Sequence, residues 1–94
     1  MQTIVVTGTS TGIGFATAVA LARAGHDVFA TMRDPARSPD LQTFATAEKL
    51  PITVIPIDVD SDASVTDAIG KVLAAKGHID VLINNAGIAQ LGSV

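Results

Sequence analysis

The fold of this 94-residue chain is decided by Thr7-Gly8-Thr9-Ser10-Thr11-Gly12-Ile13-Gly14, which directly follows the apolar run Ile4-Val5-Val6. An apolar run that leads into a glycine-rich segment predicts a turn between a buried strand and a helix. Glycine lacks a Cβ, so it adopts positive φ and lets a ligand approach the backbone closely. The following helix offers unpaired N–H groups to an anion. The stretch predicts a phosphate-binding turn, with a ligand-free structural turn as the alternative.

The glycine spacing narrows the class of nucleotide site. Gly8, Gly12 and Gly14 are spaced as G-x-x-x-G-x-G. This differs from the G-x-G-x-x-G of the commonest dinucleotide fingerprint, and a P-loop is excluded because no Lys-Ser or Lys-Thr pair follows Gly14. The turn therefore indicates a nucleotide cofactor without defining a reaction.

The composition excludes several classes of function. The chain is 48% hydrophobic and 16% charged, which excludes a disordered chain. Its net charge of −3 comes without a basic cluster, so nucleic acid is not expected as a partner. It has no cysteine, which fits a reducing compartment, and we expect a cytoplasmic location. No apolar run approaches the roughly 18 residues of a membrane span, and the first strand leaves no room for a leader, so no membrane partner is expected.

Strands and helices alternate along the chain. The apolar runs predict strands at residues 3–7, 27–32, 52–57 and 79–83. The helical periodicity predicts helices at residues 13–24 and 39–49, and a third that is capped by Asp60 or Ser61 and ended by Gly77. Each helix returns the chain to a parallel strand by a right-handed crossover. Because the strands are apolar throughout, we expect a sheet covered on both faces. The prediction is an α/β, Rossmann-type, doubly wound parallel sheet of order 3-2-1-4, in one domain over residues 1–94.

The helical periodicity also predicts which side chains are buried. Gly25 is expected to end the first helix in a left-handed conformation, and Ser38 is expected to cap the second. The residues expected to face the sheet are Ile13, Ala16, Val19, Ala20 and Ala24 in the first helix, Leu41, Phe44 and Ala45 in the second, and Val65, Ala68, Ile69, Val72 and Leu73 in the third.

The predicted strand order places two loops at one crevice. The order reverses between the first and fourth strands, and ligands in open parallel sheets bind at the carboxyl ends of the strands at that point. Residues 8–14 leave the first strand there, and Asn84-Asn85-Ala86-Gly87 leaves the fourth. We therefore expect the two loops to meet.

Three motifs follow one another in the chain: Thr7-Gly8-x-x-x-Gly12-x-Gly14, Asp58-Val59 after the third strand, and Asn84-Asn85-Ala86-Gly87 after the fourth. On these motifs the chain resembles the short-chain dehydrogenase/reductase family over essentially its whole length. The resemblance implies an oxidoreductase that transfers hydride between NAD(P)(H) and an alcohol or carbonyl substrate. It also implies a homo-oligomer at full length.

The resemblance implies a role for each motif. In the glycine turn, the pyrophosphate and adenosine ribose would lie on the backbone around Gly8, Ser10, Thr11, Gly12, Ile13 and Gly14. The Asp58 carboxylate would accept a hydrogen bond from the adenine amino group, and the Val59 backbone would contact the ring edge; the alternative for Asp58 is a cap on the following helix. Asn84 and Asn85 would tie the fourth strand to its neighbours. Ala86 and Gly87 would lie under the ribose.

The end of the second strand bears on the choice of cofactor. NAD sites place an acidic residue there for the ribose 2′-hydroxyl, whereas a 2′-phosphate requires a cation. By resemblance, Met32 stands at the position of that acid, and Arg33 follows it. Arg33 can bind a phosphate through two N–H groups, so we expect NADP(H) to be preferred over NAD(H). The alternatives are that Asp34 recruits the hydroxyl or that Arg33 only pairs with Asp34.

The family's chemistry uses a Tyr-x-x-x-Lys pair preceded by a serine, and this chain contains no tyrosine. The resemblance therefore implies no catalytic residue within the 94 residues. It implies the N-terminal cofactor-binding part of a reductase, truncated after the fourth strand, with the catalytic and substrate part absent. Such a part is expected to be marginally stable or self-associating. The alternative is a complete, non-catalytic nucleotide-binding or interaction module.

No metal site is expected. Asp60, Asp62 and Asp67 are interpreted as a solvated helix start, and His26 and His78 as residues of surface loops, because each histidine follows a helix-ending glycine.

Overall fold

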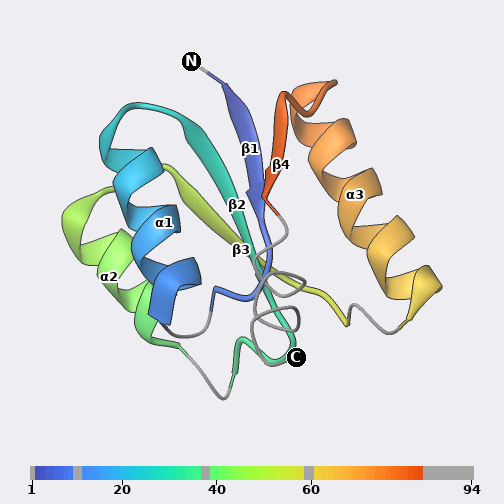
Figure 1. Cartoon of the computed structure of the whole chain (residues 1–94), viewed down its shortest axis with the longest axis horizontal. Helices are drawn as coiled ribbons and strands as arrows, with labels where there is room; N and C mark the ends of the chain where they lie inside the picture. Colours follow the sequence, from blue (N-terminus) through green and yellow to red (C-terminus); the bar gives the residue numbers. More distant parts are fainter. Residues whose placement is uncertain (1, 10–11, 37–38, 59–60, 84–94) are drawn as a thin grey trace.

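The computed structural model describes residues 2–9, 12–36, 39–58 and 61–83. Its elements are β1 (Thr3–Val6), α1 (Gly12–Arg23), β2 (Asp27–Met32), α2 (Asp40–Glu48), β3 (Ile52–Pro56), α3 (Asp62–Lys76) and β4 (Val81–Ile83) (Figure 1). All strands are parallel and lie in the order β3-β2-β1-β4, which confirms the predicted sheet. Within these ranges, no helix combines the length and apolar character that crossing a bilayer requires.

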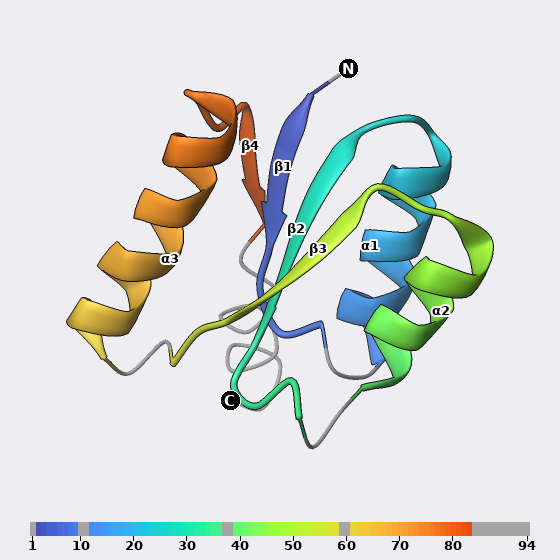
Figure 2. The same cartoon turned by 180° about the vertical axis from the view of Figure 1, so that it is seen from behind.

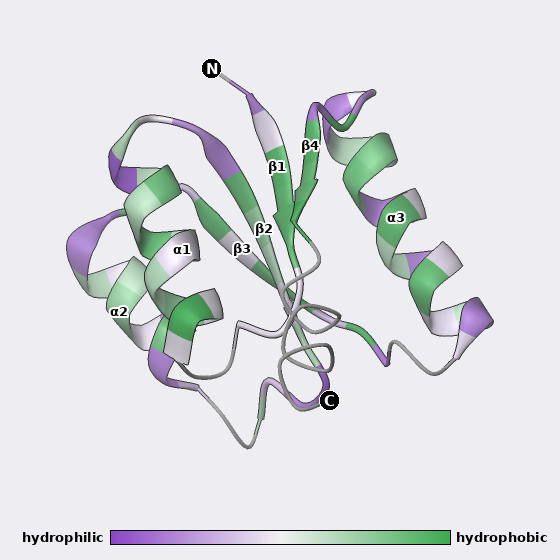
Figure 3. Cartoon of the chain, viewed as in Figure 1, coloured by the Kyte–Doolittle hydropathy of each residue, from purple (hydrophilic) through white to green (hydrophobic). Residues whose placement is uncertain are grey.

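The molecule has three layers. Helices α1 and α2 cover one face of the sheet and α3 covers the other (Figures 1 and 2). Because side chains alternate along a strand, β1 contributes to both cores: Ile4 and Val6 pack toward α1 and α2, and Val5 packs toward α3. Apolar residues consequently run along the strands and the inner flanks of the helices (Figure 3). This two-sided burial explains why the central strands are apolar throughout.

The predicted buried face of α1 was wrong except at Val19, which is half-buried and packs against the core. The structure buries Gly14, Ala18 and Ala22 in place of Ala16, Ala20 and Ala24, and leaves 75% of Ile13 exposed. The three buried residues are four apart and small, so they let the helix backbone approach the sheet closely. Since α1 is apolar on nearly every side, its periodicity did not define which face is inward.

The other helices agree better with the pattern. Leu41 and Ala45 of α2 and Ala68 and Val72 of α3 are buried, as predicted. The partly buried residues are Phe44, Val65 and Ile69, whereas the predicted core residue Leu73 is exposed.

The helix ends use the expected chemistry in most places. The Ser61 Oγ accepts the Ser64 N–H, which confirms Ser61 as the cap of α3, and Gly77 ends that helix with a φ of 79°. Gly25 also has positive φ after α1. Helix α2 begins with Pro39 at its cap position without a side-chain hydrogen bond, and the predicted cap Ser38 lies outside the described residues, as does Asp60.

The two outer strands differ from the central pair. β3 buries Ile52 and Ile55 but exposes Thr53 and Pro56, and Pro56 at its end has no N–H to offer a further strand. β4 is shorter than predicted, and Leu82 within it is 58% exposed. Burial of every strand on both faces was therefore correct only for β1 and β2. The expectation of self-association rests on β4, because an apolar strand at the edge of a sheet can pair with another chain.

A reciprocal contact joins the amino ends of β1 and β4. The Asp80 N–H donates to the Thr3 carbonyl at 2.9 Å, and the Thr3 N–H donates to Asp80 Oδ2 at 2.7 Å. The same carboxylate oxygen lies 3.1 Å from His78 Nε2. The hydrogen bond from Thr3, with a smaller effect from His78, lowers the pKa of Asp80 below its ordinary value.

We expect Asp80→Asn to lower the urea midpoint of unfolding at pH 7. A carboxylate with a depressed pKa stabilises the fold at pH values above its unfolded pKa of about 3.9, and this contribution disappears as the pH falls through the lower, folded-state pKa. The difference between variant and wild type should therefore shrink below pH ~3.9. Urea titrations from pH 7 downward test this, with Asp67→Asn on an exposed turn of α3 as the matched control. A difference that is constant with pH would contradict the argument.

Two glycines in open surroundings give a second test. A Cβ on either Gly12 or Gly70 would meet nothing within 4 Å, but Gly12 has a φ of 62° whereas Gly70 lies inside α3. We expect Gly12→Ala to destabilise the fold by about 1–2 kcal/mol, because a side chain disfavours positive φ. We expect Gly70→Ala to stabilise it by about 0.5–1 kcal/mol, because alanine is the better helix former. Unfolding free energies of the two variants measure both effects; equal signs would refute the backbone explanation.

Candidate functional site

The carboxyl ends of β1 and β4 lie side by side at the reversal of strand order. Beyond the last residue of β1, the Thr7 N–H donates to the Ile83 carbonyl at 3.0 Å, so the β1–β4 ladder continues up to the first glycine of the turn. This confirms that the glycine turn starts next to the end of β4. The residues that follow β4, Asn84, Asn85, Ala86 and Gly87, lie outside the described residues, as do Ser10, Thr11 and Val59.

The described part of the glycine turn has the backbone conformation that only glycine adopts readily. Gly8 and Gly12 both have positive φ, and, among the described residues beyond its chain neighbours and its own helix backbone, no atom lies within 4 Å of the place that a Cβ would take at Gly12. Gly14 is buried and brings α1 against the sheet. The first turn of α1 carries no acidic residue, whereas α2 and α3 begin with Asp40 and Asp62. The positive end of the α1 dipole therefore has no carboxylate of its own helix beside it.

Thr9 holds this turn in place, and the sequence analysis did not single it out. Its side chain is fully buried, and both its N–H and its Oγ1 donate to the Thr31 carbonyl, at 3.1 and 2.9 Å. The Thr31 hydroxyl in turn donates to the Val6 carbonyl at 3.3 Å. The two buried threonines thus link the end of β1, the glycine turn and the end of β2. In the sequence Thr9 stands among other hydroxyl residues, Thr7, Ser10 and Thr11, so no signal distinguished it from them.

The end of β2 changes from buried to exposed within one residue. Met32 is buried, whereas the Arg33 side chain is 73% exposed. Arg33 Nη2 lies 3.4 Å from Asp58 Oδ1, at the end of β3. The surface partner expected for Arg33 as an alternative was Asp34, its neighbour in the chain, whereas the structure pairs it with Asp58. The structure therefore brings together the two residues that were predicted to contact the adenosine end of the cofactor.

The Asp58 carboxylate is not the cap of α3. That role belongs to Ser61, while the backbone of Asp58 packs against the same helix start: its N–H donates to the Ser64 Oγ at 2.8 Å, and its carbonyl accepts the Ser61 N–H at 2.9 Å. These bonds hold Asp58 at the carboxyl edge of the sheet with its carboxylate toward Arg33. The alternative of a helix cap was therefore wrong.

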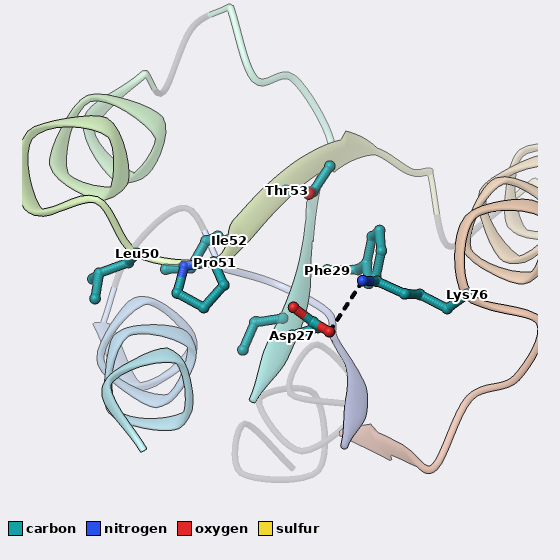
Figure 4. A pocket seen from close by; sticks show the side chains of 8 residues that line it. Asp27, Phe29, Leu50, Pro51, Ile52, Thr53 and Lys76 are labelled. Carbon is teal, nitrogen blue, oxygen red and sulfur yellow. Dashed lines mark ion pairs between the residues drawn. The ribbon is translucent and has the colours of Figure 1, made fainter. Parts of the chain in front are cut away.

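The surface has hollows at both ends of the sheet. One of about 300 Å³ lies at the amino ends of β2 and β3, beside an ion pair of 3.0 Å between Lys76 and Asp27 (Figure 4). This is the opposite end from the glycine turn, and ligands of parallel sheets bind at the carboxyl ends. A larger hollow of about 530 Å³ lies next to the residues that follow Arg33; it is lined by Asp34, Pro35, Ala36, Pro39, Gln42, Val54 and Pro56.

Both histidines bind neighbouring backbone or carboxylate groups at the amino end of the sheet. The Gln2 N–H donates to His26 Nδ1 at 3.1 Å, and His78 lies beside Asp80. Both therefore lie at the end of the sheet away from the glycine turn. Within the described ranges, no three histidine or acidic side chains gather in a way that could hold a metal ion.

Comparison with known proteins agrees with this geometry. The sequence profile of the family described as short chain dehydrogenase matches residues 2–94. Retinol dehydrogenase 8 of Bos taurus is 41% identical over 96 residues, which cover 97% of this chain and 30% of that protein. The 3-ketodihydrosphingosine reductase of Bacteroides thetaiotaomicron is 33% identical over 93 residues, which cover 99% of this chain and 31% of that protein.

A solved structure extends the likeness to three dimensions. A metagenomic short-chain oxidoreductase in complex with NADP is similar to this chain with a TM-score of 0.78 and 33% identity, over 86% of this chain and 37% of its own. The chain spans about a third of the length of these three proteins. The glycine turn, the strand order and the profile match over nearly every residue lead to one conclusion: the chain belongs to the short chain dehydrogenase family of NAD(P)-dependent oxidoreductases.

Proposed function

We propose that this chain binds NADP(H) in preference to NAD(H) and supplies the cofactor half of an oxidoreductase that moves hydride between the nicotinamide and an alcohol or carbonyl substrate. The observation that carries the proposal is the end of β2, where buried Met32 is followed by exposed Arg33. Methionine cannot accept a hydrogen bond from a ribose 2′-hydroxyl as a carboxylate does. An exposed guanidinium matches a 2′-phosphate in charge and geometry.

The glycine turn is proposed to receive the pyrophosphate. Two of its glycines, Gly8 and Gly12, have the positive φ expected of such a turn, and α1 begins without an acidic side chain. In this proposal the phosphate oxygens accept hydrogen bonds from backbone N–H groups around Gly8, Ser10, Thr11, Gly12, Ile13 and Gly14. The exposed Ile13 takes part through its backbone.

The adenosine end is proposed to bind against Arg33 and Asp58, at the edge of the sheet where the two side chains meet. The carboxylate of Asp58 would accept a hydrogen bond from the adenine amino group. Arg33 would stack on the ring or bind the 2′-phosphate. The Arg33–Asp58 ion pair supports this arrangement because it places both groups at one edge of the sheet, 3.4 Å apart. Val59, Asn85, Ala86 and Gly87 complete the proposed site. The solved relative that contains NADP supports the choice of cofactor.

The complete enzyme is proposed to be a cytoplasmic homo-oligomer whose catalytic serine, tyrosine and lysine lie outside these 94 residues. Family membership and the open glycine turn favour this interpretation over a non-catalytic interaction module.

We expect Arg33→Ala to weaken NADPH binding by about 10- to 100-fold, because charge-assisted hydrogen bonds to a phosphate contribute roughly 1.5–3 kcal/mol. Binding of NADH, which has no 2′-phosphate, should change less than about threefold on the same scale. Isothermal titration calorimetry with both cofactors measures the ratio. Arg23→Ala is the matched control, since that arginine is also an exposed ion-pair residue, with a side chain 56% exposed, but it pairs with Glu48 and lies over the Phe44 ring, away from the end of β2. Tighter wild-type binding of NADH than of NADPH would reject the preference.

The 94-residue chain should bind NADPH without oxidising it in the presence of an aldehyde or ketone. It contains no tyrosine to donate the proton that the carbonyl oxygen needs as hydride arrives. Loss of the NADPH absorbance, followed with a panel of apolar carbonyl compounds, tests this expectation. Sustained turnover would show that another group in the chain supplies the proton.

A further inference from the structure

The most completely buried polar contact near the proposed site joins Thr9 to the carbonyl of Thr31. Thr9 directs two donors to this one oxygen, its N–H at 3.1 Å and its Oγ1 at 2.9 Å, and both threonines are almost wholly buried. A carbonyl oxygen has two lone pairs, so it can accept both bonds. Because the contact is shielded from water, its loss would release the turn and not simply exchange a partner for solvent.

The contact connects the two places where phosphate groups are proposed to bind. Thr9 directly follows Gly8 in the glycine turn, and Thr31 stands two residues before Arg33 on β2. Between Thr31 and Arg33 lies only buried Met32, which belongs to the strand. The carbonyl of Thr31 is thus a rigid reference point for the turn and for the first exposed residue after β2.

We infer that Thr9 is a positioning residue that sets the distance between the pyrophosphate-binding turn and the 2′-phosphate-binding Arg33. The inference rests on the proposed function and deepens it. A ligand that carries both phosphate groups gains from the correct spacing, because its second contact forms within one molecule. A ligand without a pyrophosphate makes only one of the two phosphate contacts, so it does not gain from that spacing. Thr9 itself touches no phosphate group in this account.

A purely structural role for Thr9 makes a different prediction. A variant that only destabilises the fold lowers the fraction of folded protein. It therefore weakens the apparent affinity for every ligand by the same factor. A variant that loosens the turn relative to β2 weakens the two-point ligand alone. The ratio of two affinities therefore separates the roles, whereas a melting temperature does not.

The test uses the 94-residue chain with two probes, NADPH and adenosine 2′-monophosphate, in calorimetric titrations. Thr9→Val keeps the volume and removes the hydroxyl. This variant should weaken NADPH binding about tenfold and change the affinity for adenosine 2′-monophosphate less than about twofold. Thr9→Ser keeps the donor and should remain within about twofold of wild type for both probes. If Thr9→Val does not fold, Thr9→Cys supplies a weak donor of similar size and should show an intermediate loss for NADPH alone.

The matched control is Thr3→Val. Thr3 is also a buried threonine next to an apolar core, but it lies at the amino end of β1, away from the turn. It should leave the affinity ratio of the two probes unchanged even if it lowers stability.

The outcomes separate this inference from the proposed function. If wild type binds NADPH but Thr9→Val weakens both probes equally, or acts like Thr3→Val, the positioning role is overturned and the proposed function stands. If wild type binds NADPH no more tightly than adenosine 2′-monophosphate, the glycine turn contributes nothing, and the positioning role fails together with the proposed pyrophosphate site, whereas the preference for a 2′-phosphate at Arg33 is decided separately by the comparison with NADH. A selective loss for NADPH that Thr9→Ser rescues supports both.

Discussion

The structure depends on the position of β1 between β2 and β4, with helices on both of its faces. Its residues bond to strands on each side, and its side chains alternate between the two cores. A strand in this position has no exposed edge and no exposed face, which explains the uninterrupted apolar run Ile4-Val5-Val6. Since every other element is placed relative to β1, the turn that leaves its carboxyl end has a defined position in the sheet.

The two ends of the sheet carry different kinds of polar contact. At the amino end, Asp80 and Thr3 exchange hydrogen bonds, and Lys76 pairs with Asp27, so charged groups there neutralise one another within the protein. At the carboxyl end, the described turn shows positive-φ glycines and a helix start without an acidic residue. The first pattern holds strands together. The second pattern is the kind that favours an anion, and this difference supports the proposal that the cofactor binds at the carboxyl end.

The pairing of Arg33 with Asp58 unites features that stand 25 residues apart in the chain. An exposed ion pair contributes little to stability, so this contact does not hold β2 and β3 together; their ladder does. Its importance is that it gathers a cation and a carboxylate where the adenosine of a cofactor is proposed to lie. The bonds of Thr9 differ from this ion pair because they are buried and connect the glycine turn to β2.

The sequence by itself determined the alternation of elements, the strand order and the glycine turn. These follow from local rules: apolar runs, glycine breaks and right-handed crossovers leave few topologies for a chain of this length. Only the tertiary structure decided the inward face of α1, since that helix is apolar almost all round and its small residues Gly14, Ala18 and Ala22 approach the sheet. Only the tertiary structure also paired Arg33 with Asp58 and Thr9 with Thr31, because hydrogen bonds between distant residues depend on strand register and leave no periodic signal in the chain.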